Sequence, residues 1–553
     1  MTESNAEQPV GRHHSLLGGR EEPGRAGVRP VVNPASGRPF AEVSLLDAEQ
    51  ASTAVARAEA AFASWSRTSF RDRRRLLLGV HRHLIASADS LAQLVSREQG
   101  KPLAEARMAE VLIAAESLKH LSLHAEDALR EDTLEPQALV LAHKECRITY
   151  APLGVVLIIT PWNYPFSIAM SNVAAALAAG NTVVLKAAPA ASLIGLQVGA
   201  LFAKAGLPEG ALSVVLSNDD VAQTLVDDPR VAKIVFTGSV ATGKRIMARA
   251  AENLTPVVLE LGGKDPAIVC RDASLERAVA GVVFGAFLNA GQSCASVERV
   301  YVERPIAEEF LRRVVEQARA LRMGDPFDAD TDVGPLTLER QRAVVEAHVQ
   351  DALARGARAL TGGQRPDGDG WFYPPTVLTG VDHSMRVMRE ETFGPVLPVM
   401  TVDSFDEALT LANDSPYGLT ASVWTRAPEH AQRAARELRA GSITINDCLV
   451  SFGEPTAPWG GFKQSGIGRT HGLLGLREMV QVQHVADDWS RRPALWWYPY
   501  DREYRDVMEV ALKALHGASF WTRIVHQLRL LGFRRVLRRI NLFELLRNPD
   551  KLF

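Results

Sequence analysis

The spacing of apolar residues changes along the chain. From about Ala48 to Arg130, apolar residues recur every three or four positions, which predicts amphipathic helices. From Gly154 onward, short apolar runs alternate with helical stretches; the runs are GVVLIIT, NTVVLK, ALSVVL, KIVFTGS and PVVLEL. Such runs are typical of buried strands in a parallel sheet. We therefore expect an α/β architecture that can bind a nucleotide at the carboxyl ends of its strands.

A second alternating series, from Asp265 to about Asn446, predicts a second α/β domain. The first thirty residues are polar and rich in Gly and Pro, so we expect residues 1–30 to be a disordered tail. They lack the apolar centre of a signal peptide. No run of about eighteen apolar residues occurs, so the sequence predicts no membrane-spanning helix.

Composition excludes several classes of protein. The 553 residues are 46% hydrophobic and 23% charged, and the formal net charge is -2, which is typical of a globular protein and not of a nucleic-acid binder. The four cysteines, Cys146, Cys270, Cys294 and Cys448, have neither zinc-site spacing nor the density of a disulfide scaffold. We expect no metal site and a reducing cytoplasmic setting.

Two short stretches carry candidate chemistry. In FLNAGQSCAS, Cys294 follows a Gly-Gln pair, although a free cysteine is more often a small buried hydrophobe. The stretch GSVATGK, residues 238–244, has Walker-loop spacing, but Arg245 stands where a magnesium-binding Ser or Thr is required. That substitution argues against a nucleotide hydrolase. The turn still suits a pyrophosphate at a helix N-terminus, unless it is an ordinary strand-to-helix turn.

Five motifs occur in a fixed order and together closely resemble the aldehyde dehydrogenase superfamily, from about Val31 to Val485. They are TPWNYP (160–165), LELGGK (259–264), GQSC (291–294), EETFGPV (390–396) and GGFKQSGIGR (460–469).

The resemblance implies a domain organisation. Residues 31–262 would form a Rossmann-type NAD(P)-binding domain that includes bridging strands at about 136–150. Residues 263–446 would form the α/β catalytic domain, and residues 447–485 would return to the cofactor domain and supply an oligomerisation strand. Residues 486–553 extend beyond the usual end of the family, and the spacing of their own apolar residues predicts a helical C-terminal extension.

The resemblance also implies the catalytic residues of an NAD(P)-dependent oxidation of an aldehyde to a carboxylic acid. Cys294 would be the nucleophile, because an aldehyde releases hydride only after conversion to a tetrahedral alkoxide. Asn163 would donate to that alkoxide together with the backbone N–H of Cys294. Glu260 would activate water to hydrolyse the thioester. Alternatively, Asn163 is a simple turn residue, and Glu260 is a residue at a strand end whose side chain faces solvent.

Cofactor-binding roles follow from the same motifs. Lys186 would bind the adenosine ribose, Ser239 the pyrophosphate and Glu391 the nicotinamide ribose. Each of these residues has an alternative explanation without a cofactor: it is a solvated charge, a turn residue or a core residue. The full set of expected cofactor residues is Trp162, Lys186, Gly238, Ser239, Glu391 and Phe393.

Two departures from the family pattern bear on specificity. Pro189 replaces the glutamate that favours NAD, which leaves the choice between NAD and NADP open. Ser171 and Asn172 replace the basic pair common in semialdehyde-oxidising members. We therefore expect an apolar aliphatic or aromatic aldehyde, in a channel near three aromatic residues: Tyr164, Phe166 and Trp459.

Two other functions are weighed. A catalytically silent relative would lack Cys294 or Glu260, and both are present. A reductase acting on acyl phosphates or acyl-CoA usually lacks the LELGG glutamate, here Glu260.

The family resemblance also implies an oligomer interface. Pairing of Cys146–Tyr150 with Met479–Val485 would supply this interface, and we expect a homodimer or homotetramer.

The C-terminal extension predicts an amphipathic helix from Ser519 to Ile540, which contains six arginines and no acid. Such a helix can lie on an anionic membrane surface, so peripheral membrane contact is one interpretation. The other is packing on the protein's own surface or at the oligomer interface. The apolar positions are Trp521, Ile524, Val525, Leu528, Leu531, Phe533, Val536, Leu537 and Ile540.

Overall fold

The computed structural model describes residues 11–136, 141, 144–488, 493–534 and 536. The chain divides into two compact units. The first comprises Met1–Ala128 and Pro152–Val480, and the second comprises Leu129–Ala151 and Gln481–Phe553.

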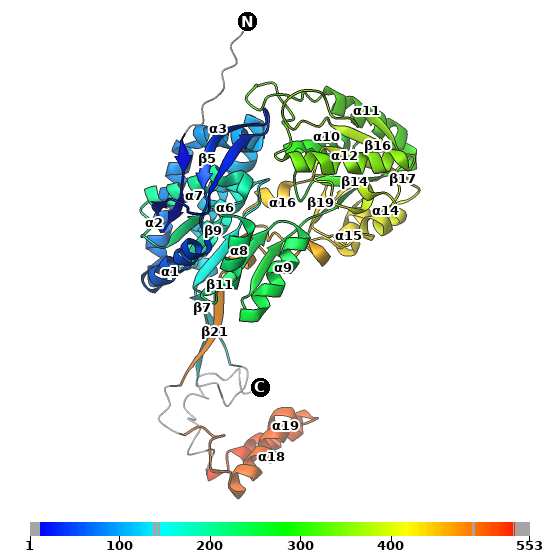
Figure 1. Ribbon diagram of the computed structural model, residues 1–553. Coiled ribbons are helices and arrows are strands. Elements are labelled where there is room, and N and C mark those ends of the chain that lie inside the picture. The colour runs from blue at the N-terminus through cyan, green and yellow to red at the C-terminus, as the bar shows by residue number, and fades with distance from the viewer. Residues whose placement is uncertain (1–10, 137–140, 142–143, 489–492, 535, 537–553) are drawn as a thin grey trace. The chain divides into compact units, whose positions relative to one another are not determined.

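The first unit contains an eight-stranded sheet with the order β20-β12-β11-β8-β9-β10-β2-β3. Two of its strands, β9 and β11, are labelled in Figure 1. Neighbouring strands from β12 to β10 are parallel, and both edges are antiparallel. These parallel strands match the predicted apolar runs, and β8 and β9 are buried throughout. The bounds are β2 Ser15–Leu17, β3 Arg20–Glu22, β8 Val155–Ile159, β9 Thr182–Lys186, β10 Leu212–Val215, β11 Val231–Thr237, β12 Val257–Glu260 and β20 Gly466–Ile467.

Helices cover both faces of this sheet. Helices α1, α8 and α9 share one apolar core with the strands, and α6 and α7 pack on β8, β9 and β10. A capping box of Asp47 and Gln50 begins α1, and Pro165 occupies the first turn of α6. The bounds are α1 Ala48–Trp65, α2 Phe70–Ala86, α3 Ala88–Gln99, α4 Leu103–Glu105, the π-helix η1 Ala106–Leu112, α5 Ile113–Ala128, α6 Pro165–Ala178, α7 Ser192–Lys204, α8 Asp219–Asp227 and α9 Val240–Ala250.

A seven-stranded sheet, with the order β15-β16-β17-β14-β13-β18-β19, forms the second α/β layer of this unit. Its strands are parallel except for the edge strand β15. Helices α10 and α11 belong to one apolar core beside the sheet, and α12, α14 and α15 to another. The bounds are β13 Asp265–Val269, β14 Val297–Glu303, β15 Arg358–Thr361, β16 Thr376–Thr379, β17 Val396–Val402, β18 Thr420–Trp424, β19 Ser442–Ile445, α10 Leu275–Phe287, α11 Arg304–Ala320, α12 Glu339–Ala354, α13 Arg386–Arg389, α14 Phe405–Asn413, α15 Pro428–Glu437, α16 Val450–Gly453 and α17 Gly472–Arg477.

The expected disordered tail is wrong for residues 11–30. Strand β2 adds to the edge of the eight-stranded sheet, where Leu16 pairs with Val214, and Leu17 is fully buried. Three further strands, β1 Arg12–His13, β4 Val28–Asn33 and β5 Arg38–Ser44, form a small sheet. The pairing of β2 with β10, which buries Leu17 and partly buries Leu16, therefore orders this segment. Residues 1–10 of that prediction lie outside the described residues.

The second unit contains the predicted strand pairing. Strands β6 Asp132–Leu134, β7 Glu145–Pro152 and β21 Val480–Asp487 form a sheet with the order β21-β7-β6. Of the bridging strands expected at about 136–150, residues 137–140, 142 and 143 lie outside the described residues.

Helices α18 Arg502–His516 and α19 Phe520–Leu530 pack together around Leu495, Val507 and Val536. The single helix expected up to Ile540 is wrong, because α19 ends at Leu530 and a turn containing Gly532 follows. Residues 537–553 are beyond the described part of the chain. Among the described helices, none combines the length and apolarity needed to cross a membrane.

Candidate functional site

A groove of about 960 Å³ lies at the carboxyl ends of β8, β9 and β11. It brings together four of the predicted cofactor residues: Trp162, Lys186, Gly238 and Ser239. Pro189 and Arg245 also line it, as do residues from distant segments that the sequence did not indicate; these include Arg340 and Trp371.

Local structure explains how the groove residues are held. Lys186 ends β9, and burial lowers the pKa of its ammonium, whose Nζ lies 3.4 Å from Asp219. Ser239 caps α9 by accepting a hydrogen bond from the Thr242 N–H. A Cβ at Gly238 would clash with the Phe236 ring. The glycine therefore lets the chain turn into α9, whose free N–H groups suit a pyrophosphate.

The loop of the EETFGPV motif packs on the LELGGK motif. Glu391 accepts a 3.0 Å hydrogen bond from the Gly263 N–H, and a Cβ at Gly262 would clash with the Glu391 carboxylate. Phe393 has a left-handed φ of 51° and meets Trp162 edge to face at 5.3 Å between ring centroids. Phe393 thus packs against Trp162, which lines the groove.

A buried ion pair holds this loop. Glu298 accepts hydrogen bonds from the backbone N–H groups of Thr392 at 2.8 Å and Phe393 at 2.9 Å. Its carboxylate pairs with Lys264, which also donates to the Thr392 hydroxyl at 3.1 Å. Burial, followed by the nearby Glu298 charge, raises the pKa of Glu391 to about 8.

A small cavity of about 20 Å³ brings Cys294 and Glu260 together. Glu260 is the last residue of β12, and its backbone lies between Thr237 of β11 and Gly466 of β20. Its side chain is buried, and within the described chain neither carboxylate oxygen has a hydrogen-bond partner. Burial raises the pKa of Glu260 well above its ordinary value. An unpartnered buried carboxylate costs free energy, so a role for Glu260 is expected.

Cys294 lies in the loop between α10 and β14. Asn289 and Ala290 in this loop have left-handed φ values of 54° and 52°. A Cβ at Gly263 would clash with the Cys294 carbonyl oxygen, so that glycine allows the two motifs to pack closely. Burial, and then the Glu391 carboxylate, raise the pKa of the Cys294 thiol. The thiol therefore needs a base to become a nucleophile.

Asn163 contacts the same loop. Its side-chain Nδ2 donates a 3.0 Å hydrogen bond to the Gln292 carbonyl, two residues before Cys294. Its own carbonyl accepts hydrogen bonds from Lys101 Nζ at 2.5 Å and Asn289 Nδ2 at 3.1 Å. The predicted catalytic residues Cys294, Glu260 and Asn163 thus belong to one region.

The three predicted channel aromatics differ in position. Trp459 lines the cavity. Tyr164 packs behind the lining, against Ile168 and Phe452. Phe166 is not among the described lining residues, because the first turn of α6 buries its side chain completely.

Ser171 and Asn172, which the sequence had already indicated, line the cavity as well. Sequence reasoning missed other lining residues, which include Phe452, Thr470 and His471. Burial, and then His120, lower the pKa of His471 to about 4, so its ring is neutral near pH 7. The one available signal was that Thr470 and His471 directly follow GGFKQSGIGR.

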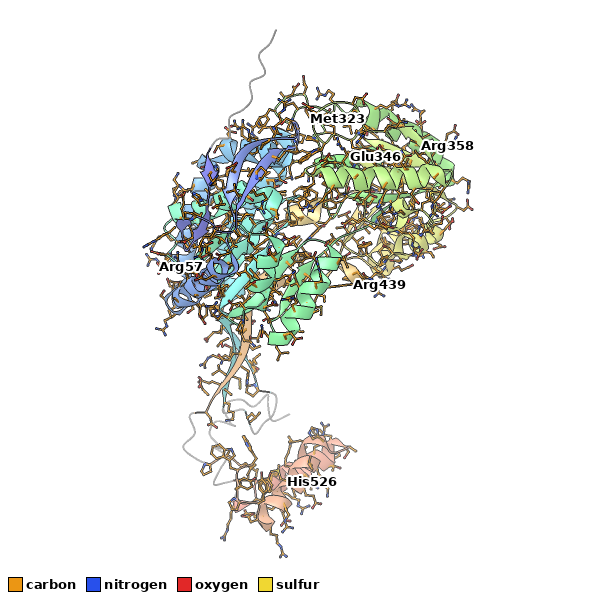
Figure 2. The ribbon with its side chains drawn as sticks, viewed as in Figure 1. Arg57, Met323, Glu346, Arg358, Arg439 and His526 are labelled. Carbon is orange, nitrogen blue, oxygen red and sulfur yellow. The ribbon has the colours of Figure 1, made fainter. Side chains whose placement is uncertain are left out.

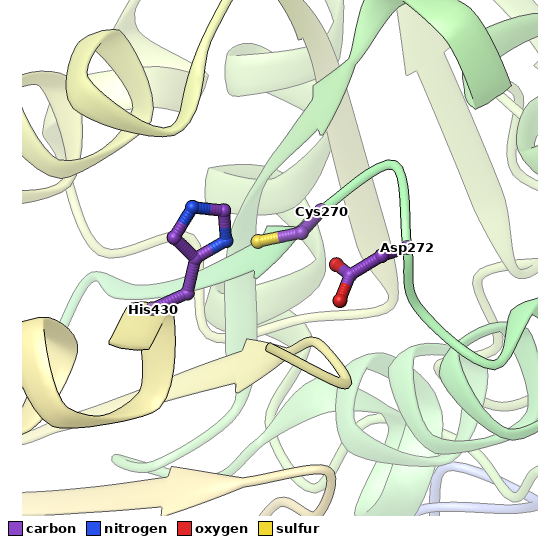
Figure 3. Close-up of side chains that lie close together, drawn as sticks. All are labelled: Cys270, Asp272 and His430. Carbon is purple, nitrogen blue, oxygen red and sulfur yellow. The ribbon is translucent and has the colours of Figure 1, made fainter. Parts of the chain in front are cut away.

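The side chains of Cys270, Asp272 and His430 lie close together (Figure 3), and none of them is among the residues that line this cavity. Their potential metal-ligand atoms all lie within 4.8 Å of one another. The Asp272 carboxylate already accepts hydrogen bonds from the Thr425 hydroxyl at 2.9 Å and the Arg426 N–H at 2.8 Å. This carboxylate joins the loops after β13 and β18, which gives it a structural role.

Comparison with known proteins agrees with these motifs. The family model described as Aldehyde dehydrogenase family matches residues 22–485. The chain is 41% identical over 455 residues to an aldehyde dehydrogenase of Paenarthrobacter nicotinovorans, covering 82% of this chain and 98% of that protein. It is 38% identical over 455 residues to the NADP(+) succinate-semialdehyde dehydrogenase 1 of Mycobacterium tuberculosis, with coverage of 82% and 98%. A solved structure of an NAD-dependent aldehyde dehydrogenase from Sinorhizobium meliloti has a TM-score of 0.85 and 35% identity, and the match covers 90% of this chain and 98% of that one.

Proposed function

This chain belongs to the aldehyde dehydrogenase family and is an NAD(P)-dependent enzyme of aldehyde oxidation, and we propose that Cys294, Glu260 and Asn163 carry out its chemistry. The observation that best supports these roles is the cavity shared by Cys294 and Glu260, in which the buried Glu260 carboxylate has no described hydrogen-bond partner.

The residues act in sequence. The Cys294 thiol loses its proton to solvent, the resulting thiolate attacks the aldehyde carbon, and the carbonyl π electrons move to oxygen. The Asn163 amide and the Cys294 backbone N–H donate hydrogen bonds to that alkoxide. NAD or NADP, when bound, supplies the hydride acceptor. Loss of hydride leaves a thioester on Cys294, and Glu260 takes a proton from the water that hydrolyses it.

We propose an uncharged aliphatic or aromatic aldehyde as the substrate. The cavity is lined by Ile168, Leu261, Phe452 and Trp459, and its described lining contains no Lys or Arg. Ser171 and Asn172, which replace the usual basic pair, lie in this lining. A distal carboxylate would thus meet no cation in the described lining, and burial of its charge there would be costly.

An aldehyde panel tests the substrate class. We expect kcat/KM for hexanal and benzaldehyde to exceed that for succinate semialdehyde by roughly tenfold or more, because burial of apolar groups discriminates by this order. A Ser171→Arg variant should reduce this difference in kcat/KM, because the arginine would supply a cation for the carboxylate of succinate semialdehyde. Faster oxidation of succinate semialdehyde by the unaltered enzyme would contradict the proposal.

Cofactor choice is tested at Pro189, an exposed residue of the groove. Without an acid at this position, we expect measurable activity with NADP. A Pro189→Glu variant should lower kcat/KM for NADP by roughly tenfold or more through repulsion of the 2'-phosphate, while NAD is affected little. Pro189→Gln is the control of equal size without charge. A preference of the unaltered enzyme for NAD above about a thousandfold, about 4 kcal/mol, would contradict this expectation.

We propose that β21 forms an interface in a homodimer or homotetramer. This strand is an edge of the three-stranded sheet, and Val482 on it is 59% exposed. An exposed edge strand offers unpaired backbone groups to a second copy. A Val482→Lys variant should shift the mass measured by light scattering toward the monomer, and an unchanged mass would place the interface elsewhere.

We further propose that the hairpin of α18 and α19 attaches the enzyme to anionic lipid. Trp521, Val525 and Leu528 form one stripe on α19 and are 73%, 52% and 65% exposed. Arg523 and Arg529 are exposed on the same helix. Figure 2 draws the side chains of this helix, with His526 labelled. Exposed aromatic and aliphatic residues beside arginines match an interfacial helix on negatively charged headgroups.

Co-sedimentation with vesicles tests this attachment. We expect the full chain to bind phosphatidylglycerol vesicles and to bind neutral phosphatidylcholine vesicles weakly. Binding should fall with added salt, because screening acts over about 8 Å at physiological ionic strength. Trp521→Ser/Leu528→Ser should lose binding, and Thr53→Ser at a partly exposed position of α1 is a neutral control. Equal, negligible binding by all proteins, with smaller oligomers for the double variant, would assign the hairpin to assembly.

A further inference from the structure

Lys101 and Glu110 form an ion pair in the interior of the first unit. Both side chains are completely buried, and Lys101 Nζ lies 3.1 Å from Glu110 Oε1. Lys101 follows α3, and Glu110 belongs to the π-helix η1. Neither residue lines the groove or the cavity as described. Burial of two charges is costly unless their remaining hydrogen-bonding capacity is used, so the other partners of the pair are informative.

Those partners all belong to one short segment. Lys101 Nζ donates a 2.5 Å hydrogen bond to the Asn163 carbonyl and lies 3.9 Å from the centroid of the Tyr164 ring. Glu110 Oε2 accepts hydrogen bonds from the N–H groups of Phe166 at 3.1 Å and Ser167 at 2.8 Å. The ammonium therefore holds the beginning of the segment, and the carboxylate holds the first turn of α6.

The held segment is joined directly to the cysteine loop. Asn289 Nδ2 donates to the Asn163 carbonyl and to the Gln292 carbonyl, each at 3.1 Å. The Asn163 amide donates to the same Gln292 carbonyl at 3.0 Å. The Asn163 carbonyl is thus shared by Lys101 and Asn289. Rotation of this peptide would break both bonds and would turn the Asn163 side chain relative to the loop that carries Cys294.

We propose that Lys101 and Glu110 are positioning residues that fix the direction of the Asn163 amide. The proposal rests on the role of Asn163 given above, as donor to the alkoxide. Preorganised donors stabilise such an oxygen because they need not reorient as the charge develops. A misplacement of about 1 Å in a catalytic group can cost roughly a hundredfold in rate. The buried pair acts through Asn163 and touches neither substrate nor cofactor.

A double-mutant cycle tests this coupling. The rate constant for formation of reduced cofactor is measured in single turnovers of Lys101→Met, Asn163→Ala and the double variant, each saturated with cofactor. We expect Lys101→Met to lower this rate roughly 10- to 100-fold, less than or about equal to the loss of roughly 100- to 1,000-fold that follows complete removal of an oxyanion donor. In the Asn163→Ala background the same change should lower it less than about threefold, because the positioned amide is already absent. Cofactor Kd, measured by tryptophan fluorescence, should stay within about threefold.

Lys233→Met provides the matched control. Lys233 is also a buried lysine, 5% exposed at its side chain, and it pairs with Glu478 at 2.6 Å. Its loss should leave the single-turnover rate within about twofold at temperatures below unfolding. If Lys101→Met does not fold, Lys101→Met/Glu110→Met removes both charges and enters the same cycle.

The possible results distinguish a failure of the positioning role of Lys101 and Glu110 from a failure of the role given to Asn163. Equal losses from Lys101→Met in both backgrounds, or no loss in either, would overturn the positioning role. If Asn163→Ala alone leaves the rate unchanged, the assignment of Asn163 as the alkoxide donor is wrong, and the proposal that rests on it falls for that separate reason.

Discussion

A Cys294→Ala variant is expected to lose aldehyde oxidation by roughly 10⁴-fold or more, because no thioester can form without the thiol. Cofactor binding should remain nearly intact. The groove at β8, β9 and β11 is lined by other residues, and Cys294 belongs instead to the small cavity with Glu260. Steady-state rates with hexanal, together with cofactor Kd values from fluorescence titration, measure both effects.

Cys146→Ala is the matched control for this experiment. Cys146 is partly exposed, as Cys294 is, and it lies on β7 in the second unit. Its removal should leave the rate within about twofold, since surface substitutions away from a site have small effects. Appreciable oxidation by Cys294→Ala would show that another group attacks the aldehyde.

The parallel sheets were predictable because their sequence signal is strong and local. VVLII in β8 is apolar throughout, and TVVLK in β9 has an apolar centre, because both faces of these strands are covered. The motifs that carry the proposed catalytic residues could also be recognised in the sequence, and the fold explains why these motifs lie close together in space. Glu260 ends a strand, Gly263 lets the following loop pack against the cysteine loop, and Gly262 leaves room for the Glu391 carboxylate.

What the sequence did not predict depends on distant partners. Strand β2 is three residues long, and only its pairing with β10 reveals that Leu17 is buried. Phe452 and His471 enter the cavity because the chain returns to the first sheet after β19, and neither carries a periodic signal.

Lys101 and Glu110 illustrate the same limit for charged residues. Within a helical pattern they resemble solvated charges, which is the usual state of Lys and Glu. Their burial follows from backbone groups of α6 and its preceding loop, more than fifty residues later in the chain. Spacing along the sequence does not encode that contact. Accordingly, the positioning role emerges only once the α6 segment is in place.

Glu260→Gln is expected to slow turnover by roughly 100-fold or more while retaining a burst of reduced cofactor. The reason is the order of the steps, since Glu260 activates water only after hydride has left. Rapid mixing with absorbance at the wavelength of reduced cofactor separates the burst from the steady state. Glu303→Gln is the control, because Glu303 is equally buried but is paired with Arg271.

The pH dependence of turnover gives a second test of the proposed role of Glu260. Burial raises the pKa of Glu260, so a larger fraction of this carboxyl is protonated near neutral pH than in water. Only the deprotonated form takes a proton from water, and turnover should therefore rise with pH as Glu260 ionises. Glu260→Gln should lose this rise in the hydrolytic step. If its burst also disappears, Glu260 acts earlier, as the base that deprotonates Cys294.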